Sequence, residues 1–360
     1  MTTRQRLDLL ARAHGKLFPR GELTRLLRAE LGHVDALDGW VVRNGIRVRT
    51  RAPKVIYHIC AGNLAVSAWT SLTLGLLLGA HNVVKLPSER EDSTAREEIL
   101  AFIRRLPASL RKLVETHRAL DEETLRRADV VIAFGSDTTM ESLRARTRWD
   151  QKFIGHGHAL SLLFIPEPHR LTRRQALACA TDVLTYDQLG CLSPQAIYVP
   201  LDTDVEVLGE NLAWALDTHW NALTRKPARP LSVAARTAEA RDMAHALGHD
   251  VWLPPTRHLG WTLIYNPQPE FQPSPLHGVI TIHQAGVTAL PKALGSVTGR
   301  ISTVGVVGET SSPWEKVFLS LGVSRFCAAG RMQFPPLTWH HDGRSPLADL
   351  VTWIDQENHS

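Results

Sequence analysis

The sequence predicts an α/β protein of two lobes, each with a mainly parallel sheet flanked by helices. Segments typical of strands alternate with segments typical of helices along most of the chain. The strand segments are continuously apolar, as expected of parallel strands that are buried on both faces. The chain of 360 residues is long enough for two lobes with separate cores.

Three βα units are predicted in the first lobe. Their strands are expected at residues 54–60, 82–86 and 129–134. Their helices are expected at residues 64–78, from the acidic residues 89–92 to about 106, and from Gly135 onward. Acidic residues suit the positive end of a helix dipole, and Ser136 or Asp137 is a suitable N-cap for the third helix.

A further βαβ unit opens the second lobe. It consists of a strand, a helix and a strand, at residues 159–165, 171–187 and 195–199. The later elements are a mostly helical stretch and two strands, at residues 203–247, 279–282 and 301–306. We therefore divide the chain into residues 1–160, 161–335 and a tail at 336–360. A short helix at residues 346–353 is expected to dock the tail on the body.

Composition and charge are those of an ordinary globular protein. Hydrophobic residues make up 44% of the chain, charged residues 21%, and the net charge is +5. The basic residues are scattered rather than gathered with aromatics on one face, which argues against nucleic-acid binding. A positive surplus suits an anionic partner such as a phosphorylated cofactor, coenzyme A or an acyl carrier protein, and it equally suits a solvated arginine-rich surface.

Signals for export, a membrane span or a metal are not found in the sequence. The N-terminus has no apolar signal region. The most apolar window, Leu64 to Ala80, contains several hydroxyl side chains, which favours a buried helix over a membrane span. The four cysteines are widely spaced, without a CxxC pair or a Cys/His cluster. This spacing predicts no metal site and a reducing, cytoplasmic setting.

Cys191 is the residue with the clearest chemical significance. It follows Gly190 at the end of an apolar-periodic segment, and the Ser193-Pro194 pair after it cannot continue a helix. The thiol is therefore expected at a turn that a substrate can reach, with backbone N–H groups nearby. A buried structural cysteine is the alternative, and it is the commoner state of a lone intracellular cysteine.

Polar residues follow the predicted strands of the first lobe. Asn63, Lys85 and the Gly135-Ser136 pair stand at the carboxyl ends of strands, where sheets of this class bind ligands. Gly135 and Ser136 at a helix N-terminus can offer N–H groups to a phosphate. The ordinary alternatives are a helix N-cap for Asn63, a solvated lysine for Lys85 and a simple β–α turn for Gly135-Ser136.

Five segments, taken together and in this order, resemble the LuxC-type acyl-CoA reductase family, a branch of the aldehyde dehydrogenase superfamily. They are residues 58–63, 83–85, 134–139, 157–161 and 187–195. The segment around Cys191 is the most specific, and the late His341-Asp342-Gly343 also looks like the family's C-terminal pattern. The resemblance implies an aldehyde-dehydrogenase-like fold in which residues 1–160 bind the cofactor and residues 161–335 carry the catalytic thiol.

The resemblance also implies a reaction, which is the NADPH-dependent reduction of a fatty acyl thioester to an aldehyde. The acyl group would come from acyl-CoA or an acyl carrier protein and would be held as an acyl-enzyme on Cys191. Asn63 matches the superfamily's asparagine that helps to hold the oxyanion. Lys85 matches the lysine that meets the adenosine ribose or its phosphate.

Further residues complete the implied cofactor site. Gly135 and Ser136 match the glycine-serine pair that approaches the pyrophosphate, and Gly157 lies in another of the matching segments. Ser88 stands where an acid would repel a 2′-phosphate, which permits NADPH, although Glu89 follows directly. Members of the superfamily commonly pair through sheet edges, which suggests a homodimer or a place in an acyl-transfer complex.

An absent acid favours the reductive direction. Aldehyde-oxidising members carry a glutamate before a Gly-Gly-Lys-Ser stretch, whereas residues 153–158 contain no acid. Oxidation to a free acid needs a base that activates water, and acyl reduction does not. The roles of His58, His156 and Glu270 stay open. Two other functions also stay open, namely a cysteine-dependent acyltransferase or thioesterase without hydride transfer and a non-catalytic scaffold.

Overall fold

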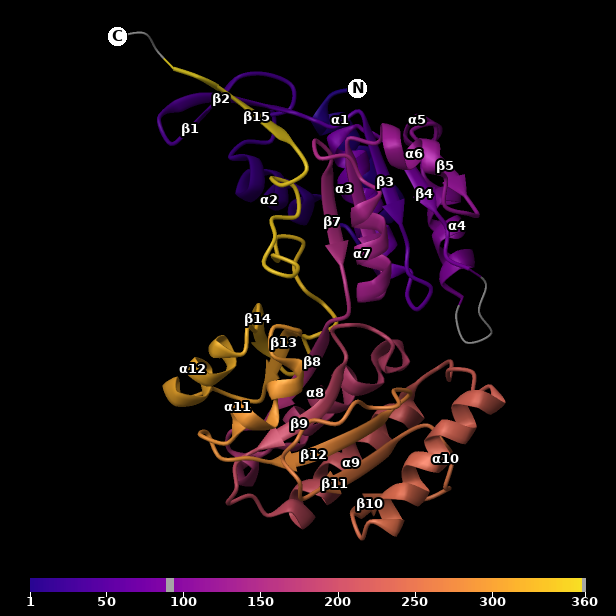
Figure 1. Cartoon of the computed structure of the whole chain (residues 1–360), viewed down its shortest axis with the longest axis vertical. Helices are drawn as coiled ribbons and strands as arrows, with labels where there is room; N and C mark the ends of the chain where they lie inside the picture. The colour runs from indigo at the N-terminus through magenta and orange to yellow at the C-terminus, as the bar shows by residue number, and fades with distance from the viewer. Residues whose placement is uncertain (89–93, 358–360) are drawn as a thin grey trace. The chain divides into compact units, whose positions relative to one another are not determined.

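The chain folds into two compact units, seen in a computed structural model that describes residues 1–88 and 94–357. One unit consists of Met1–His158 and Pro336–Ser360, and the other of Ala159–Pro335 (Figure 1). The second unit is therefore a continuous insertion into the first. Both units contain a mainly parallel sheet with helices on its two faces, so the predicted α/β class is confirmed.

The first unit is built on a five-stranded parallel sheet in the order β5-β4-β3-β6-β7. Its strands are β3 (Val55–Ile59), β4 (His81–Lys85), β5 (Val114–His117), β6 (Val130–Phe134) and β7 (Lys152–His156). The chain runs outward from β3 to β5 and then returns to place β6 on the other side of β3. The direction of winding thus changes between β3 and β6, which is where open α/β sheets bind ligands at their carboxyl edge.

Alternate residues of these strands pack against helices on opposite faces of the sheet. One face, with Ile56 and Ile132, packs on α1 (Thr3–His14), α2 (Arg20–Leu31), α3 (Val66–Leu78), α4 (Ala95–Arg105) and α5 (Ala108–Arg111). The other face, with Tyr57 and Val131, packs on α6 (Glu122–Arg127) and α7 (Asp137–Ala145). The expected helix start at residues 89–92 lies outside the described residues, and the described helix begins at Ala95.

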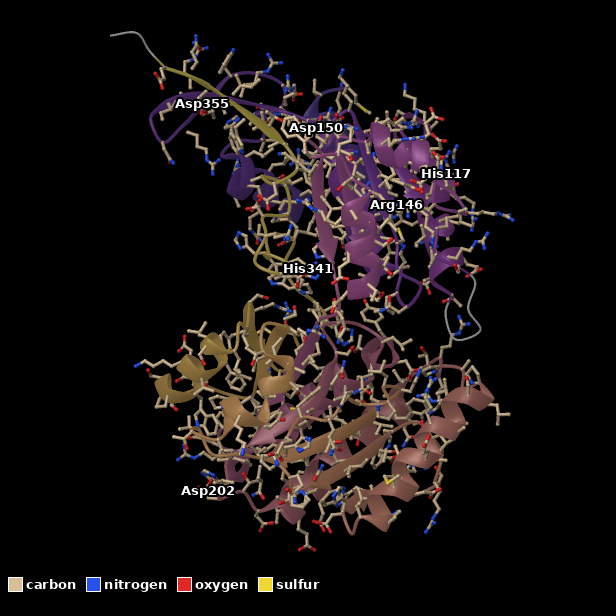
Figure 2. The ribbon with its side chains drawn as sticks, in the orientation of Figure 1. His117, Arg146, Asp150, Asp202, His341 and Asp355 are labelled. Carbon is tan, nitrogen blue, oxygen red and sulfur yellow. The ribbon has the colours of Figure 1, made fainter. Side chains whose placement is uncertain are left out.

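A three-stranded antiparallel sheet completes the first unit. Its strands are β1 (Val41–Arg43), β2 (Ile46–Arg51) and β15 (Thr352–Gln356), in that order. Asn44 and Gly45 join β1 to β2 with φ angles of 51° and 80°, as a two-residue hairpin turn requires. Figure 2 labels Asp355 on β15. The short helix expected at residues 346–353 is wrong, because residues 346–350 form turns and β15 follows, paired with β2.

The second unit contains a seven-stranded sheet in the order β10-β11-β12-β9-β8-β13-β14, parallel except for β10. Its strands are β8 (Leu160–Phe164), β9 (Pro194–Val199), β10 (Asp250–Trp252), β11 (Thr262–Asn266), β12 (Val279–Gln284), β13 (Ile301–Val306) and β14 (Arg325–Ala328). The helices α8 (Arg173–Leu184) and α9 (Val205–Ala222) cover one face. The short α11 (Leu290–Ala293) and α12 (Ser312–Ser320) cover the other, and α10 (Leu231–Ala246) packs on β11 and β12.

A buried polar network fixes α3 to the sheet of the first unit. The His58 ring bonds Ser71 Oγ through Nδ1 at 2.7 Å and Asn82 Oδ1 through Nε2 at 2.9 Å. The Asn82 amide donates in turn to the Ala80 carbonyl at 2.7 Å. Burial lowers the pKa of His58 to about 4, so the ring is neutral at physiological pH. His58, whose role the sequence left open, is therefore a structural residue.

We expect Gly75→Ala to disrupt this network. A Cβ on Gly75 would lie 1.9 Å from Asn82 Oδ1, so the amide would have to move away from His58. Overpacking together with a lost buried hydrogen bond should lower the free energy of unfolding by about 2–4 kcal/mol, measurable by urea denaturation. The matched control is Gly21→Ala in α2, because a Cβ there meets nothing within 4 Å. Equal stability of the two variants would contradict the expectation.

Candidate functional site

Cys191 lies in a turn directly before β9, at the amino-terminal edge of the second unit's parallel sheet. The turn is closed by the Ser193 N–H, which donates to the Gly190 carbonyl at 3.0 Å. Ser161 Oγ, at the start of β8, donates to the Cys191 carbonyl at 2.8 Å. Cys191 is half-buried rather than packed in the core. A reacting group can therefore approach a thiol whose backbone is fixed.

The other three cysteines are poor nucleophiles. Burial raises the pKa of Cys60 to about 12, and it raises the pKa of Cys179 further. Cys327 is half-buried like Cys191, but burial raises the pKa of its thiol to about 11. A thiol with such a pKa is almost wholly protonated at neutral pH, whereas the thiolate is the reactive form.

The segment before Cys191 has an unusual backbone. Tyr186, Asp187 and Gln188 have φ angles of 56°, 54° and 62°, so three consecutive L-residues are left-handed. The left-handed conformation costs roughly 1–2 kcal/mol per residue for residues with a Cβ. The helix expected at residues 171–187 therefore ends earlier, with α8 at Leu184.

Two side chains of this left-handed segment carry its tertiary contacts. Gln188 Nε2 donates to the carbonyls of Pro194 and Val279 at 2.8 and 3.0 Å, and its Oε1 accepts from the Gly278 N–H at 2.9 Å. The Asp187 carboxylate accepts two hydrogen bonds of 2.7 Å from the Arg229 guanidinium. His277 Nδ1 lies 2.5 Å from the same carboxylate. These contacts join the segment of residues 186–188 to β9, β12 and the loops beside them.

The other side of the Cys191 turn is held by the loop after β14. Gln333 Nε2 donates to Ser193 Oγ at 2.9 Å. The Asp182 carboxylate of α8 accepts from the Gly330 and Met332 N–H groups at 2.5 and 3.0 Å. Burial raises the pKa of Asp182 to about 7, although these N–H groups oppose the shift. The Cys191 turn is thus held by hydrogen bonds to residues that precede it and to residues that follow it in the chain.

In the first unit, the predicted polar residues gather at the carboxyl edge of the sheet. Asn63 is exposed in the loop after β3, and Gly135-Ser136 follows β6, so the two lie on opposite sides of the point where the winding changes. Lys85 is the last residue of β4 and is half-buried, and Ser88 is exposed beyond it. Ala65, not Asn63, is the N-cap residue of α3. α3 therefore begins three residues after Asn63, and Ala65 makes no side-chain cap hydrogen bond.

The start of α7 lies at this edge of the sheet. Ser136 is the N-cap, as predicted, and its Oγ accepts from the Thr139 N–H at 3.3 Å. The Asp137 carboxylate accepts from the His158 N–H at 2.8 Å, and a Cβ on Gly157 would lie 2.6 Å from its Oδ1. Gly157 therefore makes room for Asp137. Backbone N–H groups at the start of a helix are groups to which phosphates commonly bind.

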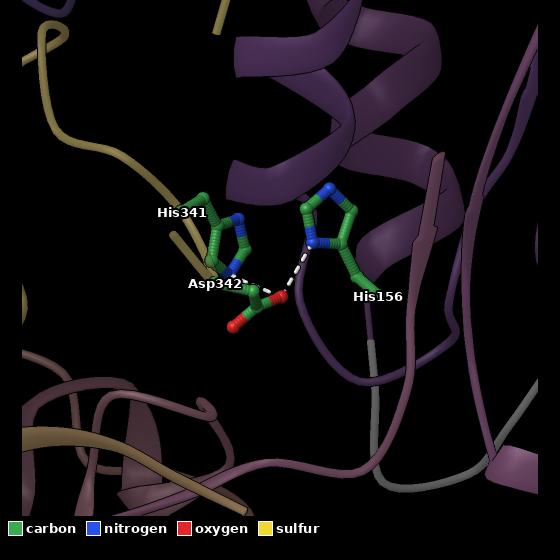
Figure 3. Close-up of side chains that lie close together, drawn as sticks. All are labelled: His156, His341 and Asp342. Carbon is green, nitrogen blue, oxygen red and sulfur yellow. Dashed lines mark hydrogen bonds and ion pairs between the residues drawn. The ribbon is translucent and has the colours of Figure 1, made fainter. Parts of the chain in front are cut away.

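Beside this edge, four neighbouring rings, of which the first three are stacked and the last is tilted, join the returning C-terminal segment to β6 and β7. Ring centroids are 4.7 Å apart for Phe134 and His156, 4.2 Å for His156 and His341, and 4.5 Å for His341 and Trp339. His156 Nδ1 lies 2.7 Å from Asp342 Oδ2, as Figure 3 shows. Burial, reinforced by His156, lowers the pKa of His341 to about 4, so this ring is neutral.

The cluster of His156, His341 and Asp342 is the one group among the described residues with three candidate metal ligands close together. Its geometry does not suit an ion. The two imidazole planes are stacked and only 18° from parallel, so their in-plane lone pairs run side by side instead of meeting at one point. A bound zinc ion would need both nitrogens at about 2.0–2.1 Å. Burial raises the pKa of Asp342, but the hydrogen bond from His156 and the charges around it outweigh burial, so the pKa of Asp342 is below its usual value.

The structure thus divides the predicted site residues between the two units. Asn63, Lys85, Ser88, Gly135, Ser136 and Gly157 belong to the first, and Cys191 to the second. Glu270 is exposed. The sequence did not indicate Arg229 and His277 as site residues. They contact Asp187 from 42 and 90 residues away, and no local sequence pattern marks them.

Comparison with solved structures identifies the fold. An indole-3-acetaldehyde dehydrogenase from P. syringae, solved with NAD+, is similar with a TM-score of 0.67 and 12% identity over 99% of this chain and 84% of that one. An NADP-dependent glyceraldehyde-3-phosphate dehydrogenase from Bacillus halodurans, solved with NADP, has a TM-score of 0.66 and 12% identity over 99% and 87%. The fold is that of the aldehyde dehydrogenases, as the resemblance implied.

Sequence comparison then identifies the family. The profile of the acyl-CoA reductase (LuxC) family matches residues 2–353, and the chain belongs to this family. The long-chain acyl-protein thioester reductase of Aliivibrio fischeri is 25% identical over 351 residues, covering 95% of this chain and 72% of that protein. A second such reductase, from Photobacterium leiognathi, is 24% identical over 355 residues, covering 96% and 72%. The protein is thus an oxidoreductase of the acyl reductase type, and the resemblance seen in the sequence is confirmed. In the part of the chain that the structure describes, no helix has the length and apolar character to cross a membrane.

Proposed function

We propose that this protein reduces a fatty acyl thioester to an aldehyde with NADPH, through an acyl-enzyme on Cys191. The observation that carries the proposal is the half-buried thiol on a turn fixed from both sides, in a chain of this family. The relatives named as long-chain acyl-protein thioester reductases support a fatty acyl group carried on a protein thiol. Acyl-CoA is the second carrier to be tested.

The chemistry begins at sulfur. The Cys191 thiolate attacks the carbonyl carbon of the substrate thioester, and a new C–S bond forms. The old C–S bond then breaks, and the carrier leaves as a thiol after taking up a proton. The negative charge on the carbonyl oxygen during this step needs hydrogen-bond donors. We assign the Asn63 side-chain amide and the Cys191 backbone N–H to this role.

We assign the cofactor to the carboxyl edge of the first unit's sheet. Gly135, Ser136 and Gly157 would lie along the pyrophosphate, and Lys85 and Ser88 would lie at the adenosine ribose. Ser88 in place of an acid suits the 2′-phosphate of NADPH better than an acid would. When bound, NADPH would supply the hydrogen and the electron pair that convert the acyl group on Cys191 to an aldehyde.

Water must be kept from reacting with the acyl-enzyme. Residues 153–158 hold no acid that could activate water there. This arrangement favours reduction over hydrolysis. Because none of the four cysteines forms a disulfide, we propose a reducing, cytoplasmic setting. The three-stranded sheet ends at β15, and such an edge strand suits pairing with a second copy or with a member of an acyl-transfer complex.

The proposal is tested by offering the protein a panel of fatty acyl-CoA thioesters and an acylated acyl carrier protein. We expect one NADPH consumed, followed by its absorbance, for each aldehyde formed. Without NADPH, mass spectrometry should find one acyl group on the peptide that contains Cys191. Release of free fatty acid without NADPH would instead indicate a thioesterase. A stable adduct with no NADPH consumption would indicate a scaffold.

A further inference from the structure

We infer that Asp187, Arg229 and His277 are positioning residues, which hold the segment before Cys191 in its left-handed conformation and so aim the thiol. The inference rests on the proposed role of Cys191 and extends it to three residues that lie earlier or later in the chain.

The local backbone preferences of residues 186–188 do not favour their left-handed conformation. L-residues enter the left-handed region singly, and Tyr186, Asp187 and Gln188 do so in sequence. A second strained segment lies against the first, because Leu276 and His277 have φ angles of 67° and 56°. Strain of this kind persists only where the surrounding structure enforces it, and it is concentrated at functional sites.

The enforcing contact is a charge cluster shielded from water. The side chains of Asp187 and Arg229 are 12% and 14% exposed, and that of His277 is 4% exposed. The planar guanidinium meets both carboxylate oxygens, which fixes the direction of the carboxylate as well as its distance. Arg229 also donates to the Leu259 carbonyl at 3.2 Å, and Arg236 lies 3.5 Å from His277 Nε2. Asp187 is therefore held by Arg229 and His277, and each of these side chains has a further contact of its own.

The cluster is connected to the thiol through the backbone. Two contacts join the left-handed segments 186–188 and 276–277. His277 contacts Asp187, and the next residue, Gly278, donates to Gln188. Residues 189 and 190 then lead directly into the turn that carries Cys191. A change in the φ angles at residues 186–188 would swing this turn and displace the sulfur. A displacement of about 1 Å at a reacting atom can lower a rate about a hundredfold.

Arg229→Lys is the main test, because lysine keeps the charge but cannot meet both oxygens at once. We expect the single-turnover rate of Cys191 acylation by an acyl-CoA, without NADPH, to fall at least about tenfold. The apparent affinity for the acyl-CoA should change little. Alkylation by iodoacetamide, which needs only a reachable thiol, should stay within about threefold of the wild-type rate. His277→Gln should behave in the same way, and it stands in if Arg229→Lys does not fold.

The matched control is Arg241→Lys. Arg241 is a buried arginine of the same unit that donates to Thr262 Oγ1 and to the His258 and Trp261 carbonyls. The Arg241→Lys variant should lower the melting temperature about as much as Arg229→Lys does, and it should leave the acylation rate unchanged.

A second-site rescue adds a measurement that a loss of stability alone would not change. Tyr186→Asn, which places a residue tolerant of the left-handed region in the strained segment, should restore part of the acylation rate to Arg229→Lys.

The outcomes separate this inference from the proposed function. Wild-type protein that is never acylated on Cys191 would refute both. Acylation of the wild type together with an unchanged rate in Arg229→Lys and His277→Gln would refute the positioning role alone. Acylation that falls equally in Arg241→Lys, in step with the melting temperature, would also refute it.

Discussion

Replacement of Cys191 by alanine is expected to abolish both acyl-enzyme formation and aldehyde production. Without the sulfur no covalent acyl group can form, and loss of a covalent nucleophile lowers turnover by at least about a thousandfold. The measurements are intact-protein mass after incubation with acyl-CoA and the rate of NADPH consumption. Circular dichroism should show an unchanged fold, since Cys191 lies in a surface turn and is only half-buried.

Cys327→Ala is the matched control for this experiment. Cys327 lies in the same unit and has similar exposure, but its thiol stays protonated at neutral pH because burial raises its pKa to about 11. This variant should acylate and turn over at nearly the wild-type rate. Persistent acylation of Cys191→Ala, or its loss in Cys327→Ala, would place the nucleophile elsewhere.

Asn63→Ala should give the second largest effect. Removal of one donor to a developing oxyanion typically costs about 3–4 kcal/mol in the barrier, so acylation and turnover should fall about a hundred- to a thousandfold. Asn63→Asp should be similarly slow, because a carboxylate cannot donate a hydrogen bond. The melting temperature should change little, since Asn63 is exposed in a loop and lies outside α3.

Asn211→Ala is a suitable control for Asn63→Ala. Asn211 is an amide on α9 that donates to the Val207 carbonyl at 2.9 Å within its own helix. It should leave both steps unchanged. Normal acylation in Asn63→Ala would remove this residue from the reaction, and a large loss of stability would give it a structural role instead.

The sequence predicted best the features that depend on neighbours along the chain. The apolar runs around Ile56, Val83 and Val131 became the parallel strands expected of them. The turn at Cys191 was predictable because Gly190 readily adopts turn conformations and Pro194 cannot continue a helix. Ser136 was predictable as an N-cap because its hydroxyl needs only the N–H three residues on.

Features that depend on distant partners could not be predicted in this way. A helix was expected at residues 346–353, because the pairing of β15 with β2 joins residues far apart in the chain and leaves no local signal. Tyr186 and Asp187 were expected to end a helix, because Arg229 and His277, whose contacts hold this segment, lie far along the chain. The hairpin of β1 and β2 does have a local signal in the sequence, because Asn44-Gly45 favours a two-residue turn.

The insertion of one unit into the other has a consequence for synthesis on the ribosome. Residues 159–335 emerge as one stretch and can fold while residues 352–356 are still being translated. Until then β1 and β2 form a two-stranded hairpin, which is marginally stable alone and exposes the edge of β2 that β15 later covers. A nascent chain is thus open to strand exchange with neighbouring chains on the same polysome until its last strand leaves the exit tunnel.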